Sequence, residues 1–368
     1  MKEKYIIVKG IAGMANRTLT LLSAIIYAHI TKRKLFVDWG DGVYSNDKIN
    51  IFDKIFDCPI IEKKIKINKN NTVFPIIWKN NLDKDAVTFF NENTLWKKYS
   101  GKEIKKKYSI DISNTDFKED IVVFIDYMFN FEKIQKYLDT LPDFWPRDSK
   151  GIQKFLLKKY IKPSIDISRK IEEFKKINFT ENIIGVHVRY TDNMKKIYIK
   201  NMGINIDSYF PTIDGILEKE PQSKIFLSTD NKKVIELFKE KYINIIFIDK
   251  YFPENDVAIH LIKNFDKLKI AEEAVIDLYL LSSCNQLVYS SGSSYGRLSL
   301  FLSDIKECNV FDLNPQDKKI VIKKTILSQK YTRERIDIYD FIGRIGRILY
   351  NKLPKIYYLL KPYFPDEF

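Results

Sequence analysis

The sequence predicts an α/β protein built from two doubly wound halves. Three observations carry this prediction: a strand–glycine loop–helix–strand unit at residues 5–38, an alternation of strand and helix patterns from residue 183 onward, and a length of 368 residues. That length exceeds the usual size of one domain. A strand, a crossover helix and a second strand form a βαβ unit with parallel strands. We therefore expect a parallel sheet in each half.

The first half opens with the clearest of these units. Residues 5–9 form a short apolar run that predicts a strand, and Gly10 and Gly13 form the loop that follows. Residues 16–31 carry Leu and Ile at helical spacing, and residues 35–38 predict the next strand. This unit places a glycine loop at the start of a long helix.

The rest of the chain divides into an irregular part, a regular part and a tail. Residues 40–175 are rich in Lys, Asn and aromatic residues, and helical patterns are visible only at 154–160 and 167–176. Beyond them, strands are expected at residues 183–188, 224–228, 245–248, 287–289 and 310–313. Helices are expected at residues 212–219, 232–241, 271–283 and 298–302. We accordingly predict an N-terminal domain at 1–177, a Rossmann-like domain at 178–330 and a basic aromatic tail at 331–368, with a cleft between the two domains.

Composition favours anionic partners and a reducing compartment. The formal net charge is +14, with Lys spread along the chain, which favours nucleotides or phospholipids over nucleic acid. The three cysteines, Cys58, Cys284 and Cys308, form neither a disulfide framework nor a zinc pattern. The sequence shows no signal peptide and no run of about 20 apolar residues. We expect a cytoplasmic protein, soluble or attached peripherally to the inner membrane face.

A segment of the C-terminal tail is the candidate for this membrane attachment. Residues 338–349 place Ile, Phe and Leu at i, i+3, i+4 spacing, with basic residues elsewhere on the helical wheel. Such a segment can lie on an anionic membrane surface. The alternative is a C-terminal helix packed on its own domain, and Gly343 and Gly346 favour it because they weaken an isolated helix.

The most informative stretch is Ile-Ile-Gly-Val-His-Val-Arg-Tyr-Thr-Asp at residues 183–192. An apolar strand pattern ends in His187, Arg189 and Asp192, and open α/β sheets bind ligands at the carboxyl ends of their strands. An Arg beside a His suits a phosphate-bearing ligand, because the guanidinium grips phosphate through two parallel bonds. The alternative is an Arg–Asp ion pair at the strand end with a packed His.

A second cluster follows the expected strand at 287–289. The loop Ser-Ser-Gly-Ser-Ser contains Ser293 and Ser294 and leads into an apolar helix that carries Arg297. Hydroxyl groups, free backbone N–H groups and a helix N-terminus can hold phosphate. The alternative is an ordinary turn in which Ser294 caps the helix.

Two further groups lie at strand ends. Asp230 follows the strand at 224–228 and either contacts a ligand or caps the next helix. Gly13, Asn16 and Arg17 follow the first strand, in a G-x-x-G rather than a G-x-G-x-x-G pattern. That loop is either a plain βα turn or, with Asp38 at the end of the next strand, a weak dinucleotide signal.

Taken in order, these motifs resemble one family. The Gly-x-x-Gly-x-x-Asn-Arg loop, FVDWGDGVYS, HVRYTD, STDN and IDLYLLSSCNQLVYSSGSSYGRLS resemble the fucosyltransferases with an HxRxxD motif. The similarity is strongest to the NodZ-type nodulation enzymes and the α1,6-fucosyltransferases. It covers about residues 5–58 and 180–300. The resemblance implies a GT-B-like architecture, GDP-fucose as the donor, a glycan acceptor, inversion at the anomeric carbon and no metal or other cofactor.

The resemblance also implies roles for the residues that match its motifs. Arg189 would neutralise the leaving phosphate, His187 would help to fix the diphosphate or its ribose, and Asp192 would orient Arg189. The donor-binding residues implied or suggested by position are Asp230, Asp277, Ser293, Ser294, Arg297, Gly13, Asn16 and Arg17. Among them, Asp277 would recognise guanine N–H groups.

Departures from the family limit what the resemblance implies. Relatives with α1,6 specificity carry a second Arg where this chain has Tyr190, and a basic residue where it has Asn193. The linkage is therefore not predicted, and Asp41 and Asp192 are the only candidates we name for a general base. Two other functions remain open: a transferase that uses another nucleotide sugar, and a non-catalytic basic protein that binds nucleotides or nucleic acid.

Overall fold

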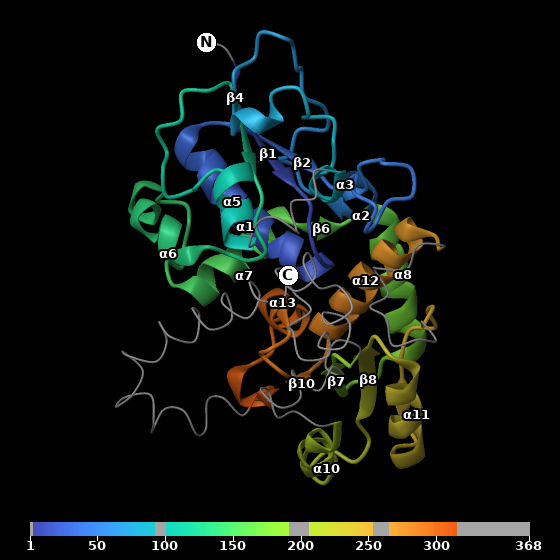
Figure 1. Cartoon of the computed structure of the whole chain (residues 1–368). Helices are drawn as coiled ribbons and strands as arrows, with labels where there is room; N and C mark the ends of the chain where they lie inside the picture. Colours follow the sequence, from blue (N-terminus) through green and yellow to red (C-terminus); the bar gives the residue numbers. More distant parts are fainter. Residues whose placement is uncertain (1–2, 93–100, 191–205, 253–264, 315–368) are drawn as a thin grey trace, which may run out of the picture.

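The computed structural model describes residues 3–92, 101–190, 206–252 and 265–314 (Figure 1). The predicted tail at 331–368 and Asp192 lie outside these residues, and both remain predictions. Within the described part, two parallel sheets carry the fold, as the sequence predicts. No described helix is long and apolar enough to cross a membrane.

The first sheet contains four parallel strands in the order β2-β1-β5-β4. In the register of the central strands, Val8 of β1 lies between Val37 of β2 and Phe124 of β5. The elements of this half are β1 (Tyr5–Lys9), α1 (Met14–Thr31), β2 (Lys34–Asp38), α2 (Phe52–Ile55), β3 (Phe56–Asp57), β4 (Val73–Phe74), α3 (Ala86–Glu92), α5 (Gly101–Tyr108), β5 (Ile121–Phe124), α6 (Phe131–Ile134), α7 (Ser149–Tyr160), β6 (Lys162–Pro163) and α8 (Ile165–Asn178). Short 3-10 turns lie at Ile76–Trp78 and Gln135–Thr140.

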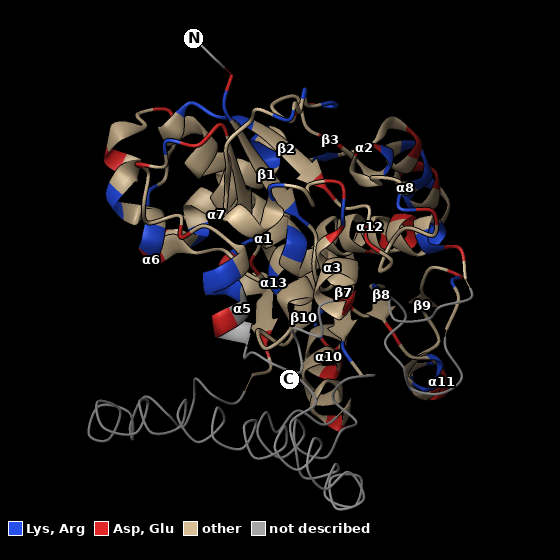
Figure 2. Ribbon diagram, turned by 45° about the horizontal axis from the view of Figure 1, so that its top comes forward, with Lys and Arg blue, Asp and Glu red and all other residues tan. Residues whose placement is uncertain are grey.

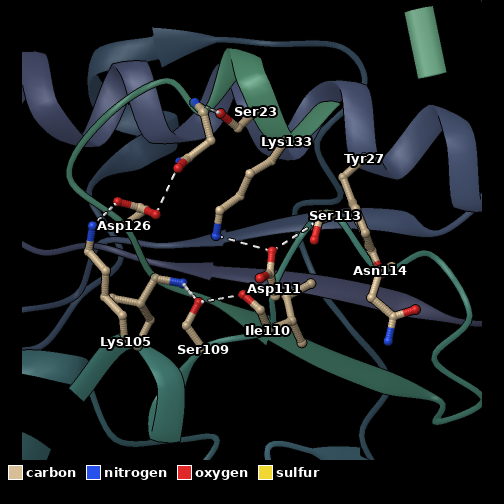
Figure 3. A network of polar contacts seen from close by, with 12 residues as sticks. Ser23, Tyr27, Lys105, Ser109, Ile110, Asp111, Ser113, Asn114, Asp126 and Lys133 are labelled. Atoms are coloured by element: carbon tan, nitrogen blue, oxygen red, sulfur yellow. Dashed lines mark hydrogen bonds and ion pairs between the residues drawn. The ribbon is translucent and has the colours of Figure 1, made fainter. Parts of the chain in front are cut away.

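A polar network fastens the segment after β5 to the helices on either side (Figure 3). Asp126 forms an ion pair with Lys105 of α5. It also accepts a 3.0 Å hydrogen bond from the side-chain amide of Asn130. The backbone N–H of Asn130 donates in turn to Ser23 Oγ of α1, at 2.9 Å. Both carboxylate oxygens of the buried Asp126 thus have a partner, as buried polar groups usually do. The carboxyl end of β5 is therefore held in place against α1 and α5.

The second sheet contains five parallel strands in the order β11-β10-β7-β8-β9. Its central strand β7 is buried at all six positions, which explains its continuous apolar sequence. The elements are β7 (Ile183–Val188), α10 (Phe210–Leu217), β8 (Lys224–Thr229), α11 (Lys232–Lys241), β9 (Ile245–Ile246), α12 (Lys267–Ser282), β10 (Gln286–Tyr289), α13 (Ser294–Leu302) and β11 (Val310–Asp312). Short 3-10 turns lie at Ile206–Ser208 and Glu307–Asn309.

The two halves share one hydrophobic core. Helix α13 packs against α1 and α7, and α12 packs against α8 and α1, so helices of the second half lie between the two sheets (Figure 1). Asn46 adds a polar contact, since its side chain accepts a hydrogen bond from Lys267 N and donates one to the carbonyl of Phe265. The loop after β2 is therefore attached to the start of α12.

Charged residues of both signs lie on the outer helices, among them α8 and α11 (Figure 2). The predicted α/β class with two Rossmann-like halves is confirmed. The domain boundary at 177/178 stays a prediction, and it falls at the end of α8.

Candidate active site

Three adjacent strands of the second sheet end in polar residues at one edge. Strands β7, β8 and β10 are parallel neighbours, so their carboxyl ends meet. Arg189 follows β7, Asp230 follows β8 and the serine loop follows β10. The sheet therefore assembles at one edge groups that are distant in the sequence.

His187 lies at the centre of this edge and is buried. Its Nδ1 is 3.4 Å from Ser228 Oγ and its Nε2 is 3.0 Å from Ser293 Oγ. Ser228 donates its single hydroxyl proton to Asp277 Oδ2 at 2.9 Å, so it accepts from His187 Nδ1–H, and Nε2 then accepts from Ser293. The imidazole ring also stacks on Tyr295, with centroids 5.1 Å apart. The ring is thus fixed in one orientation and one tautomer.

Glycine at position 296 permits this packing. A Cβ there would lie 2.8 Å from the ring of Tyr289 and 3.1 Å from His187 Cδ2, closer than carbon atoms normally approach. We infer that Gly296 lets the first turn of α13 reach the histidine.

The protonation of His187 makes folding depend on pH. Burial, the largest effect, lowers the pKa of His187 from its ordinary 6.5 to about 4. Between these values the unfolded chain binds more protons than the folded chain, so stability rises with pH. We expect His187 to cost about 3 kcal/mol of stability as the pH falls from about 6.5 to about 4. Urea unfolding of the wild type and His187→Gln at several pH values measures this, and identical pH dependences would contradict it.

Arg189 is held at the strand end and remains partly accessible. Its Nη1 lies 2.9 Å from Asp230 Oδ2, and 28% of the arginine side chain is exposed. Asp230 Oδ1 accepts a 2.8 Å hydrogen bond from the backbone N–H of Tyr190. The helix-cap alternative for Asp230 is wrong, because Asn231 caps α11 by accepting from Lys233 N. An oriented, partly exposed guanidinium is suited to binding a phosphate group.

The serine loop places a helix N-terminus beside His187. Ser293, rather than Ser294, is the N-cap of α13, and its hydroxyl oxygen accepts from Gly296 N. The first turn of α13 contains no acidic residue, so its positive end is left for an anion. Ser294 is half-buried and Arg297 is exposed. The loop and the histidine are therefore one unit, whereas Arg297 faces solvent.

Asp277 is buried on α12 and completes the polar chain that starts at Ser293. Its Oδ2 accepts from Ser228 and from Lys250 Nζ, which is 2.7 Å away. Its Oδ1 is buried without a hydrogen-bond partner among the described residues. Lys250 was not predicted from the sequence, because it follows a short edge strand and no local pattern distinguishes it from the other lysines.

The N-terminal glycine loop contributes a rigid turn. Arg17 is buried beneath it, with 1% of its side chain exposed, and donates two hydrogen bonds to the carbonyl of Ala12. Ala12 has a φ of 60°, a conformation that non-glycine residues adopt rarely and at some cost. Gly13 precedes α1 as its N-cap without a side-chain cap, and Asn16 is half-buried in the first turn. Arg17 therefore supports the loop from below, and its contact with the donor stays a prediction.

Asp41 is the second partner of Arg17. Its Oδ2 lies 3.0 Å from Arg17 Nη2, and only 1% of its side chain is exposed. Burial raises the pKa of Asp41, and Arg17 acts in the opposite direction. A buried, ion-paired carboxylate is poorly placed to take a proton from an acceptor. The dinucleotide alternative depended on Asp38. Its Oδ2 forms an ion pair with Lys9 Nζ, 2.6 Å away.

Tyr44 connects this loop region to the second half. The ring lies under the Arg17 guanidinium, and the hydroxyl accepts from Met14 N at 2.9 Å. Burial raises the pKa of Tyr44, and Arg189 of the second half is among the charges that oppose this rise. The start of α1 and the end of β7 therefore face the same region.

Among the described residues no group of three or more His, Cys, Asp or Glu side chains is placed to hold a metal ion.

Comparison with known proteins gives one family match and several similar folds. Residues 152–307 match the family model of the α-(1,6)-fucosyltransferase N- and catalytic domains. Among solved structures, fucosyltransferase NodZ from Bradyrhizobium is similar at 18% identity and a TM-score of 0.52, over 82% of this chain and 94% of that one. A NodZ α-1,6-fucosyltransferase soaked with GDP-fucose gives 20% identity and a TM-score of 0.51, over 82% and 93%. A variant of FUT1 from Arabidopsis thaliana in complex with GDP has 15% sequence identity and a TM-score of 0.53, over 83% of this chain and 70% of that one.

The fold has two Rossmann-like halves, and the family match over residues 152–307 supports glycosyltransferase activity. Within that class, the match over residues 152–307 confirms the resemblance to the α1,6- and NodZ-type fucosyltransferases. The solved structures, all of low identity, support the fold. The roles of individual residues remain predictions.

Proposed function

We propose that this protein is an inverting fucosyltransferase that transfers fucose from GDP-fucose to a glycan. The observation that carries the proposal lies at the carboxyl edge of β7 and β10, within the region matched by the fucosyltransferase family. There His187 is hydrogen-bonded to Ser293, and Arg189 is held by its ion pair with Asp230. The proposal does not extend to an α1,6 linkage, because Tyr190 stands where relatives with that specificity carry a second Arg. The side chain of Tyr190 is partly buried and packs against the core of the second half.

The residues of this edge suit the departure of a diphosphate. Breaking the bond between fucose C1 and the phosphate oxygen leaves negative charge on GDP and positive character on the sugar. Arg189 and the N-terminus of α13 offer positive charge where that negative charge develops, which lowers the barrier. His187, neutral near pH 7, supplies a fixed ring surface and orients Ser293 without adding charge.

The acceptor side is assigned by position. Tyr44, which follows β2, lies close enough to Arg189 for the guanidinium to affect the pKa of its hydroxyl, so we take the first half as the acceptor side. Attack from that side, opposite the leaving phosphate, inverts the configuration at C1. We assign no general base, since Asp41 is buried and Asp192 lies outside the described residues.

A donor panel tests the proposal. Calorimetric binding and nucleotide release are measured for GDP-fucose, GDP-mannose and UDP-galactose, each with and without EDTA. We expect GDP-fucose to be preferred over UDP-galactose by at least about 100-fold, because a site built to hydrogen-bond one base rejects another strongly. Preference for GDP-mannose would support the alternative of another nucleotide sugar. Tight binding without any turnover would support the non-catalytic alternative, and loss of turnover with EDTA would contradict a metal-free reaction.

A further inference from the structure

Lys250 lies at the same edge of the sheet as Arg189 and His187, but on the side of Asp277. It follows β9, the parallel neighbour of β8, and only 12% of its side chain is exposed. Its Nζ lies 2.7 Å from Asp277 Oδ2 and 5.7 Å from the ring centroid of Phe252. An ammonium group is therefore fixed next to a buried carboxylate.

This ion pair leaves one carboxylate oxygen without a donor. Asp277 Oδ2 accepts two hydrogen bonds, whereas Oδ1 accepts none from the described residues. A buried acceptor without a partner costs about 1–3 kcal/mol, and folded proteins satisfy nearly all such groups. The side chain of Asp277 is 95% buried and joined through Ser228 to His187. The missing donor is thus best supplied by a ligand bound at this edge.

The Lys250–Asp277 pair complements one purine in particular. Guanine presents an acceptor, O6, beside two donors, the N1–H and N2–H groups. A carboxylate accepts from those N–H groups, and an ammonium group, which has three donors and no acceptor, matches O6. Adenine presents a donor at the 6-position and an acceptor at N1, so both contacts would be mismatched.

We propose that Lys250 is a specificity-determining residue that donates a hydrogen bond to O6 of guanine, beside the guanine N–H groups that the family resemblance already assigns to Asp277. The inference rests on the proposed function, since it takes the donor nucleotide to be bound at this edge. In the free protein Lys250 neutralises Asp277. In the complex the same ammonium group also contacts the base, so one lysine stabilises the carboxylate and selects the nucleotide.

A combination of protein variants and altered bases tests the inference. Kd values are measured by calorimetry for GDP, 6-thio-GDP, IDP and ADP with the wild type and Lys250→Met. Replacing O6 by sulfur, a poor acceptor, should weaken binding to the wild type about tenfold, as expected for a charge-assisted hydrogen bond. The Met variant should bind GDP and 6-thio-GDP equally, within about twofold. IDP, which lacks the N2 amino group read by Asp277, should be weakened by the same factor in both proteins.

Controls separate this contact from a structural role and from the proposed function. Lys241→Met removes an exposed ion pair with Asp214 and should leave all four Kd values unchanged. Lys250→Gln keeps a donor and should restore discrimination against 6-thio-GDP even if Lys250→Met folds poorly. Equal discrimination against 6-thio-GDP by wild type and Lys250→Met would overturn the inference and leave the proposed function intact. A wild type that binds no guanine nucleotide, yet binds UDP-galactose, would overturn both.

Discussion

Replacing Arg189 by Ala is expected to lower the turnover of fucosyl transfer about 100- to 1000-fold. Arg189 is the partly exposed cation at the carboxyl end of β7, and Asp230 holds its orientation. Removing one preoriented group that stabilises a developing negative charge typically costs about 2.7–4 kcal/mol of transition-state stabilisation. Arg189→Lys keeps the charge but loses the two-pronged grip on phosphate, so its turnover should lie between those of wild type and Arg189→Ala. The measurement is kcat and KM with GDP-fucose for all three proteins.

An exposed arginine provides the matched control. Arg169 pairs with Asp166 on the surface of α8, and Arg169→Ala should leave kcat unchanged. Thermal unfolding shows whether Arg189→Ala remains folded, which is expected because the lost ion pair is only partly buried. Full activity of folded Arg189→Ala would return the Arg189–Asp230 pair to the role of a structural ion pair at a strand end.

Replacing Arg17 by Met is expected to destabilise the protein by about 3–5 kcal/mol. The change leaves Asp41 buried without its cation, and breaking one side of a buried ion pair costs about that much. It also removes both side-chain bonds to the carbonyl of Ala12, so the strained turn loses its support. Urea unfolding of wild type and variant measures the loss.

The double variant Arg17→Met with Asp41→Leu distinguishes this cause from a general packing defect. Removing both charges leaves no buried ion, so it should be less destabilised than the sum of the two single variants. Lys34→Met, which breaks an exposed pair with Glu3, is the surface control and should change stability by less than about 1 kcal/mol. Additive effects of the two single changes would contradict the role of the buried pair.

Sequence patterns located most of the strands that are buried on both faces. The predicted bounds of β1 and β7 agree with the structure, because an uninterrupted apolar, β-branched run fits only a central strand of a parallel sheet. The central strand β5 was missed, although Ile-Val-Val-Phe at 121–124 carries the same signal. It is only four residues long and lies in a stretch whose Lys, Asn and aromatic residues obscure any strand–helix alternation. The start of α11 was predicted correctly, whereas other helix starts were set too late, as at α12, where Asp266 accepts from Lys269 N and caps the helix.

The sequence predicted which residues of the candidate site lie at strand ends, but it did not predict which of them are in contact. His187 and Ser293 were proposed from separate motifs, and only the fold brings His187 Nε2 within 3.0 Å of Ser293 Oγ. Arg17 was predicted to bind the donor because it follows a glycine loop. The structure buries it, since Asp41 and the rings of Trp39 and Tyr44 surround its guanidinium. A local motif states which side chains are near a turn but not which way they point.

The sequence by itself determined the α/β class, the strand ends that form the candidate site and the resemblance to fucosyltransferases. These properties depend on local periodicity and on short motifs, which neighbouring residues encode. Only the tertiary structure decided that Asp230 contacts Arg189, that Lys250 contacts Asp277, and that the Tyr44 region of the first half faces the end of β7. Such contacts join residues tens to hundreds of positions apart, and they are fixed by strand order and helix packing, which no single segment specifies.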